Sequence, residues 1–240
     1  MNPCLLFAAL ALTPGQDLIS PLAKSKQFAD SMQWAAIEAC PKLTVRSTDS
    51  ATGSAVALAV KDGFVWLLTA GHVVRPGAAT DVDFCRRASY PARDLTLNEA
   101  LVVAKDPISD LALMKVPLRE EDRVPPCLKL VLPGQRSKAF PFPALAVGCD
   151  EGGSARCTAD EVIARTLVRR GKGEMAFFWE TATESKPGRS GGALLDKQGR
   201  VIGICSARQN EHGFYTHSDE IHAWLKPLGY DWLWKDSVLK

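Results

Sequence analysis

The sequence predicts an all-β fold of two six-stranded antiparallel β-barrels, with a C-terminal helix and a helical N-terminal extension. Short apolar and β-branched runs recur at regular spacing from residue 44 onward, and turn-forming pairs such as Asp62-Gly63 separate them. These runs fall into two groups on either side of residues 119–143, a stretch rich in charge and proline. Two groups of short strands around a linker predict two barrels.

These signals divide the 240 residues into five segments. Residues 1–15 are a candidate signal peptide and residues 16–42 an N-terminal extension with a helix expected over 21–39. The first barrel half is expected over residues 43–118 and the inter-barrel linker over 119–143. The second barrel half spans residues 144–240 and includes the C-terminal helix, expected near 219–228 with Ser218 as a candidate N-cap.

Composition is that of an ordinary globular protein, with 46% hydrophobic and 23% charged residues. A formal net charge of +2 supplies no electrostatic reason to bind nucleic acid. No apolar run approaches the ~20 residues that a membrane-spanning helix needs. We therefore expect neither a nucleic-acid partner nor stable membrane insertion; the sequence leaves the oligomeric state open.

The N-terminus carries an apolar run over residues 4–12, and Ala9-Leu10-Ala11 matches a small-x-small cleavage pattern. The run predicts a secreted or periplasmic protein. The segment before it lacks Lys and Arg, so an apolar terminus that packs on the domain is the alternative.

Removal of Cys4 with a signal peptide would leave six cysteines. Among these, Cys149 and Cys157 flank a short glycine-bearing loop, which predicts a disulfide bond between them; buried free thiols are the alternative. No cysteine or histidine spacing is typical of a metal site. We expect no metal and no organic cofactor.

A serine lies among glycines in Gly188-Arg189-Ser190-Gly191-Gly192, before an apolar alternating run. A serine hydroxyl is a poor nucleophile at neutral pH and needs a neighbouring base and a site for the developing oxyanion. Glycine backbone can aim N–H groups at such a charge. The loop predicts Ser190 as a nucleophile and the N–H groups of Gly188 and Ser190 as the oxyanion hole.

Two other segments supply the partners of this serine. His72 directly follows an apolar strand, where an imidazole can accept the serine proton and return it to a leaving group. Asp110 precedes Leu111-Ala112-Leu113, so its carboxylate stands at the start of a strand and can orient the imidazole. Asp106 is a weaker candidate because it precedes Pro107 in a turn.

In their sequence and order, these segments resemble the chymotrypsin-like (trypsin-like) serine peptidases. Thr69-Ala70-Gly71-His72 is similar to the family's histidine motif, Asp110-Leu111-Ala112-Leu113 to its aspartate motif and 188–192 to its serine motif. The form of the aspartate and serine motifs is closest to the bacterial Htr-type branch. The resemblance covers about residues 44–228 and implies a serine endopeptidase with polypeptide substrates.

Three departures from the family are visible. Arg189 stands where animal digestive relatives carry an aspartate that pairs with a newly cut N-terminus. No Ile-Val-Gly-Gly start is present, so that zymogen switch is not expected. The chain ends soon after the terminal helix, so the peptide-binding module appended in Htr-type relatives is not expected here.

The resemblance also implies the substrate-binding residues. Ser206, Ala207 and Arg208 align with the segment that pairs with the substrate backbone. Glu184 lies near the place where trypsin-like enzymes carry the acid that selects Lys or Arg, and Lys186 is near enough in sequence to neutralise it. Htr-type relatives accept small or medium aliphatic residues, and the loop resembles that branch more, which favours an aliphatic pocket.

Two alternative functions stay open. Gly188-x-Ser190-x-Gly192 also satisfies the nucleophile-elbow pattern of α/β-hydrolases, which would make the protein an esterase. A trypsin-like binding module whose chemistry has decayed is the second. Two other features are interpreted as structural: Arg169, Arg170 and Lys172 as a hydrated turn, and His222 as part of a solvated helix face.

Overall fold

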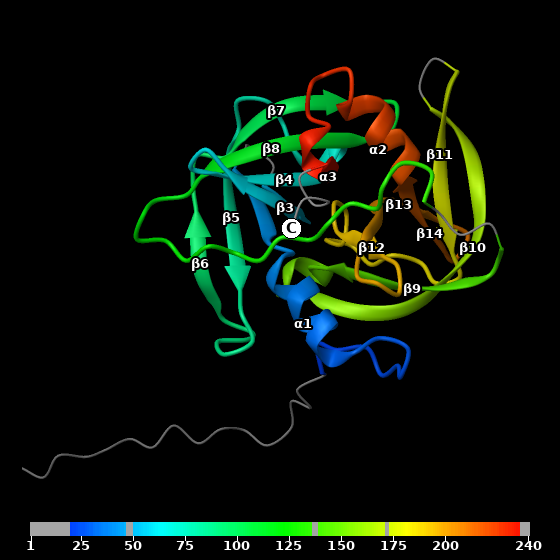
Figure 1. Ribbon diagram of the computed structural model, residues 1–240, viewed down its shortest axis with the longest axis horizontal. Helices are drawn as coiled ribbons and strands as arrows, with labels where there is room; N and C mark the ends of the chain where they lie inside the picture. The colour runs from blue at the N-terminus through cyan, green and yellow to red at the C-terminus, as the bar shows by residue number, and fades with distance from the viewer. Residues whose placement is uncertain (1–19, 47–49, 136–138, 171–172, 236–240) are drawn as a thin grey trace, which may run out of the picture.

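The computed structural model describes residues 20–46, 50–135, 139–170 and 173–235. Figure 1 shows two β-rich halves side by side, with α1 (Asp30–Glu38) on one side of their junction and α2 (Ser218–Leu225) on the other. The candidate signal peptide, residues 1–15, lies outside the described residues, so export stays a prediction. None of the described helices is long and apolar enough to cross a membrane.

The first half consists of two antiparallel sheets. The sheets have the strand orders β2-β1-β5-β6 and β3-β4-β8-β7. Their strands are β1 (Lys42–Arg46), β2 (Ala51–Ser54), β3 (Val56–Lys61), β4 (Phe64–Ala70), β5 (Ala79–Cys85), β6 (Arg93–Leu97), β7 (Leu101–Asp106) and β8 (Leu111–Pro117). Ala55 separates β2 from β3, so one extended run of chain contributes to both sheets.

The second half is a closed barrel in the order β10-β11-β14-β13-β12-β9. Its strands are β9 (Phe142–Gly148), β10 (Arg156–Arg170), β11 (Glu174–Thr181), β12 (Ala193–Leu195), β13 (Val201–Gln209) and β14 (His212–His217). The predicted all-β fold with two barrel-like halves is confirmed. The second half has the six strands expected, whereas the described residues of the first half form two four-stranded sheets in place of one six-stranded ring.

Three apolar clusters hold these elements together. One lies within the first half, around Leu43, Leu67 and Phe84, and one within the barrel, around Trp179 and Tyr215. The largest joins the two halves and also contains residues of the helices, among them Ile37, Leu68, Leu113, Val147, Ile221 and Trp234. Burial of this shared cluster therefore holds the halves against each other, because apolar burial contributes roughly 25 cal/mol per Å².

The N-terminal helix is shorter than the predicted 21–39, because α1 begins only at Asp30. Gln33, fully buried, holds the preceding segment in a folded-back course: its Oε1 accepts the Ala23 N–H at 2.7 Å and its Nε2 donates to the Phe28 carbonyl at 3.1 Å. The Pro21 carbonyl accepts the N–H of Cys157 at 2.7 Å. Tertiary hydrogen bonds thus replace the first turns of the expected helix.

The C-terminal segment forms α2 and a short α3 (Trp232–Lys235). The N-cap of α2 is His217, whose Nδ1 accepts the Asp219 N–H at 2.9 Å, so the assignment of Ser218 was wrong. His222 is buried and packs against the Trp234 ring with 4.7 Å between centroids. The interpretation of His222 as a solvated helix residue was therefore wrong.

The six cysteines in the described residues are free, so the predicted Cys149–Cys157 disulfide is not formed. Cys157 pairs with Val147 in the β9–β10 ladder, and its thiol donates to the Gln33 carbonyl at 3.6 Å. Cys149 lies beyond the end of β9, where its N–H donates to the Ser54 hydroxyl at 2.8 Å. The two thiols belong to the apolar cluster that joins the halves, as buried free cysteines do.

The buried His222 predicts a loss of stability in acid. Burial lowers the pKa of His222 from 6.5 to about 4. Between these pH values the unfolded chain binds a proton at His222 and the folded chain does not. The free energy of unfolding should therefore fall by up to about 1.4 kcal/mol for each unit by which the pH is lowered. Urea unfolding of the wild type and of His222→Phe at pH 7, 6 and 5 measures this. An equal decline in both proteins would contradict the prediction.

Candidate active site

His72 and Asp110 are brought together at the ends of neighbouring strands. β4 and β8 pair from Phe64↔Pro117 to Ala70↔Leu111, which places the short helix η1 (Gly71–Val73) beside Asp110. His72 Nδ1 lies 2.8 Å from Asp110 Oδ2, and the His72 N–H donates to Oδ1 at 2.9 Å. A carboxylate only accepts, so Nδ1 carries the proton and Nε2 is left as the acceptor. This is the tautomer that a general base requires.

Asp110 is buried and receives further donors from the barrel half. The Ser206 hydroxyl donates to Asp110 Oδ2 at 2.5 Å, and Arg170 Nη2 lies 3.6 Å from the same oxygen. Burial alone raises the pKa of Asp110, but the hydrogen bonds from His72 and Ser206 outweigh it and hold that pKa below its usual value. Asp110 is therefore ionised at neutral pH and its negative charge faces the imidazole.

Ser190 lies in the barrel half, on the loop before β12, and a hydrogen bond across the two halves positions it. The Ser54 N–H donates to the Ser190 carbonyl at 2.8 Å. Gly53 leaves room for this approach, because a Cβ there would lie 2.6 Å from a Val73 methyl and 3.2 Å from the Ser190 carbonyl. Ser190 thus lies beside the histidine segment. Among the described residues, its hydroxyl has no hydrogen-bond partner, His72 included.

The loop before Ser190 begins with a tight turn. The Arg189 N–H donates to the Lys186 carbonyl at 3.1 Å, so Pro187 and Gly188 occupy the central positions. Gly188 has a φ of 85°, and proline followed by a residue of positive φ is typical of a type II turn. A Cβ on Gly188 would lie 2.4 Å from the Cys149 carbonyl oxygen. Only glycine satisfies both constraints.

Separate hydrogen bonds fix the orientation of two peptide groups in this loop. The Pro187 carbonyl accepts the Glu151 N–H at 2.7 Å, and the Arg189 carbonyl accepts the Gly192 N–H at 2.8 Å. In a trans peptide the N–H points opposite to the carbonyl, so these bonds direct the N–H groups of Gly188 and Ser190 away from them. Within the described chain neither N–H has an acceptor. The two N–H groups predicted to form the oxyanion hole are therefore free to donate, and hydrogen bonds to the carbonyls of the same peptides fix their direction.

A buried ion pair between Arg189 and Asp150 anchors the same loop. Arg189 donates from Nε to Asp150 Oδ1 and from Nη2 to Asp150 Oδ2, both at 2.7 Å, and its Nη2 also donates to Thr158 Oγ1 at 3.0 Å. The two charged side chains are 5% and 7% exposed. Asp150 begins the short helix η2 (Asp150–Gly152), which also supplies the Glu151 N–H. The ion pair thus connects the serine loop to the segment that orients Gly188.

Three of the four predicted substrate-binding residues, Ser206, Ala207 and Arg208, lie along one stretch of β13, and Glu184 lies between β11 and β12. The pairing of β13 with β12 ends at Ile204, so residues 206–208 have no strand partner on that side within the described chain. The Ser206 side chain is turned to Asp110. Glu184 and Arg208, each with its side chain 50% exposed, form an ion pair at 3.6 Å. The partner of Glu184 in the structure is therefore Arg208, where Lys186 had been considered.

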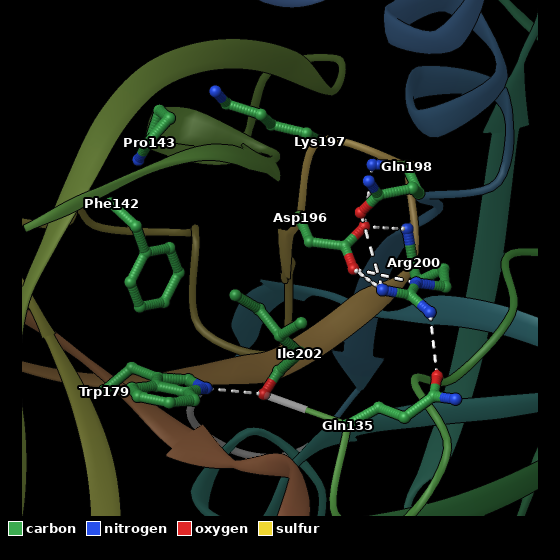
Figure 2. A pocket seen from close by; sticks show the side chains of 9 residues that line it. All are labelled: Gln135, Phe142, Pro143, Trp179, Asp196, Lys197, Gln198, Arg200 and Ile202. Atoms are coloured by element: carbon green, nitrogen blue, oxygen red, sulfur yellow. Dashed lines mark hydrogen bonds and ion pairs between the residues drawn. The ribbon is translucent and has the colours of Figure 1, made fainter. Parts of the chain in front are cut away.

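A cavity of about 580 Å³ lies at another part of the barrel half (Figure 2). Phe142, Trp179 and Ile202 form its apolar side. Arg200 on the other side donates to Asp196 Oδ2 at 2.8 Å and to Gln135 Oε1 at 2.9 Å. None of the residues that line it is a predicted site residue. These polar groups satisfy one another, so the cavity adds no group to the catalytic arrangement.

Sequence reasoning missed several residues of the site. Arg170 was interpreted as part of a hydrated turn, yet it ends β10 and its Nη2 lies 3.4 Å from Ser206 Oγ beside Asp110. Neither Ser54 nor Asp150 was predicted as a site residue. No local pattern marks these three residues, because their partners are more than 30 positions away along the chain.

Comparisons with known proteins match the segment that carries these motifs. The family model of the trypsin-like peptidase domain matches residues 52–204, which include His72, Asp110 and Ser190. The Serine protease Do-like HtrA of Bacillus subtilis (strain 168) is 26% identical over an alignment of 203 residues, and the match covers 80% of this chain. This chain spans only 41% of the length of that relative.

Two solved structures are similar in fold. The active form of the Rv3671c protease from M. tuberculosis superposes with a TM-score of 0.68 at 20% identity, over 94% of this chain and 95% of that one. The HtrA-type protease AlgW with a tripeptide has a TM-score of 0.65 at 26% identity, over 83% of this chain and 62% of that one. The first likeness concerns the fold alone; the second extends to an Htr-type sequence.

The buried Arg189–Asp150 pair predicts a coupled effect on stability. Arg189→Met or Asp150→Leu alone should lower the free energy of unfolding by about 3–5 kcal/mol, because each leaves a buried charge without its partner. The double variant should lose much less than the sum, since no buried charge is left unpaired. Urea denaturation of the four proteins measures the coupling, and additive losses would contradict it.

Proposed function

We propose, because the chain belongs to the trypsin-like peptidase family, that it is a serine endopeptidase that uses Ser190 as nucleophile, His72 as general base and Asp110 as the orienting acid. The supporting observation is the buried Asp110 carboxylate, which holds His72 Nδ1 at 2.8 Å and leaves Nε2 free to accept a proton. The N–H groups of Gly188 and Ser190, aimed away from their neighbours, are the proposed oxyanion hole.

The proposed reaction follows the acyl-enzyme route. Ser190 Oγ attacks the scissile carbonyl carbon as its proton passes to His72 Nε2, and the carbonyl oxygen becomes an oxyanion bound by the two N–H groups. The imidazolium, stabilised by Asp110, then gives the proton to the leaving amine as the C–N bond breaks. Water repeats the sequence on the acyl-enzyme. Such nucleophile–base bonds often tighten only when substrate binds, which accounts for the unbonded Ser190 hydroxyl.

We propose that the substrate binds as an extended strand beside residues 206–208 of β13. An open strand edge pairs with an extended peptide through main-chain hydrogen bonds. The first specificity pocket would lie between this strand and the segment from Thr183 to Ser185, where the Ser185 hydroxyl donates to the Ala207 carbonyl at 3.2 Å. Arg208 neutralises Glu184 at this pocket. An aliphatic residue is therefore favoured over Lys or Arg.

The two alternatives fare differently. An α/β-hydrolase requires a helix directly after the nucleophile, but the chain continues from Ser190 into the strand β12, and the surrounding fold is all-β. The hypothesis of an α/β-hydrolase esterase is therefore rejected. A binding module with decayed chemistry is kept as the second candidate because Ser190 Oγ and His72 are not hydrogen-bonded within the described residues.

A serine-directed probe separates the two candidates. A fluorophosphonate should label the wild type at Ser190 and fail to label Ser190→Ala, and His72→Ala should lose most labelling because the hydroxyl loses its base. Hydrolysis of peptide p-nitroanilides should fall by at least about 10³-fold in both variants. A folded wild-type protein that is neither labelled nor hydrolytic would be a binding module.

The Glu184–Arg208 pair predicts the cleavage preference. Digestion of a peptide library by the wild type should show cleavage after small or medium aliphatic residues. Arg208→Ala exposes the Glu184 charge and should raise the kcat/KM ratio of Lys over Val substrates about tenfold. The double variant Arg208→Ala/Glu184→Ala should return that ratio to the wild-type value. Wild-type cleavage confined to Lys and Arg, and lost in Glu184→Ala, would overturn the aliphatic proposal.

A further inference from the structure

Ser54, at the end of β2 in the first half, forms hydrogen bonds to both the histidine motif and the serine motif. It is fully buried. Its N–H donates to the Ser190 carbonyl at 2.8 Å and its carbonyl accepts the Thr69 hydroxyl at 2.7 Å. Its own hydroxyl donates to the Gly188 carbonyl at 2.8 Å and accepts the Cys149 N–H at 2.8 Å. Ser54 thus contacts the serine loop twice, through its main-chain N–H at Ser190 and through its side-chain hydroxyl at Gly188.

The Gly188 carbonyl belongs to the peptide group that lies between the two oxyanion donors. The ψ angle of Gly188 and the φ angle of Arg189 set how the two neighbouring peptides, which carry the N–H groups of Gly188 and Ser190, are oriented relative to each other. An uncompensated change in either angle would turn one of these N–H groups. At the other end of the Gly188–Arg189 peptide, the Arg189 N–H donates to the Lys186 carbonyl at 3.1 Å. The Ser54 hydroxyl holds the carbonyl end, from the other half of the molecule.

Loss of this hydroxyl would remove a hydrogen-bond partner from one part-buried and one buried backbone group. The Gly188 carbonyl and the Cys149 N–H each have the Ser54 hydroxyl as a hydrogen-bond partner. An unpaired buried polar group is unfavourable, and a loop peptide can relieve it by rotating. A rotation that relieved the Gly188 carbonyl would move the peptide between the two proposed oxyanion donors.

We infer that Ser54 is a positioning residue of the oxyanion hole, which aligns the Gly188 and Ser190 N–H groups through the Gly188 carbonyl. This inference rests on the proposed serine-peptidase function. Ser54 touches neither the substrate nor the reacting atoms. Its effect is therefore on the transition state, in which the oxyanion exists, and substrate binding in the ground state is left largely unchanged.

The test is the kinetics of Ser54→Ala, which removes the hydroxyl and keeps the N–H to the Ser190 carbonyl. We expect kcat on a peptide p-nitroanilide to fall about 10- to 100-fold, less than the loss of a direct oxyanion donor, with KM within about twofold. The inhibition constant of a peptidyl boronic acid, which forms a tetrahedral adduct with a serine, should rise by a similar factor. Ser54→Thr, which keeps a hydroxyl, should recover part of kcat.

Ser218→Ala is the matched control. It removes another buried serine hydroxyl, at the start of α2 and outside the catalytic segments, and should keep the wild-type kcat. A kcat of Ser54→Ala equal to the wild-type value, a rise in KM alone, or a threonine variant as slow as the alanine variant would overturn the inference. Should Ser54→Ala fail to fold, Ser54→Cys replaces it, because a thiol is a weak donor and acceptor; it must show the same loss of kcat.

The outcomes distinguish a failure of the proposed function from a failure of the role of Ser54. A wild-type protein without hydrolysis or fluorophosphonate labelling would overturn the proposed function and the role of Ser54 with it. An active wild type whose Ser54→Ala variant is equally active would overturn the role of Ser54 alone.

Discussion

The proposed catalytic arrangement depends on hydrogen bonds between the two halves of the chain. His72 and Asp110 come from the first half and Ser190 from the second, so no single sheet aligns them. The Ser54 N–H to the Ser190 carbonyl, at 2.8 Å, and the Ser206 hydroxyl to Asp110, at 2.5 Å, cross the junction in opposite directions. Apolar burial presses the halves together without direction, and these bonds fix how they align.

A buried ion pair within the barrel half anchors the serine loop. Arg189 directly precedes Ser190, and its partner Asp150 belongs to the same half, with both side chains almost fully buried. The guanidinium donates to both carboxylate oxygens, so the geometry of the pair is fixed as well as its charge. The loop that carries the proposed oxyanion donors is therefore also held by contacts within one half.

The N-terminal and C-terminal segments stabilise the junction from outside the barrels. Ile37 of α1, Ile221 of α2 and Trp234 of α3 belong to the same apolar cluster as Leu113 of the first half and Val147 of the second. The helices therefore extend the shared core. Because α1 contacts β5, β9 and β10, the N-terminal extension bridges the two halves on one side. Loosening these helices would loosen the alignment of the catalytic groups.

The sequence by itself determined the all-β class and the two halves, and it located three short motifs that predict a serine-peptidase site. Alternation, turn pairs and a proline-rich linker are local signals, and so are a serine among glycines and a histidine or aspartate at a strand end. Local signals also misled: the helix expected over 21–39 begins at Asp30, because Gln33 binds the backbone before it, and Cys149 and Cys157 remain thiols.

Only the tertiary structure decided which residues hold the proposed site in place. Ser54, Asp150 and Arg170 reach partners that are 134, 39 and 36 residues away in the chain. No spacing rule encodes such contacts, since they exist only when both halves are folded and packed. The same holds for the first half, whose run from β2 to β3 passes from one sheet into the other at Ala55. Residue type states what a side chain can do; the packing of distant segments decides which partner it meets.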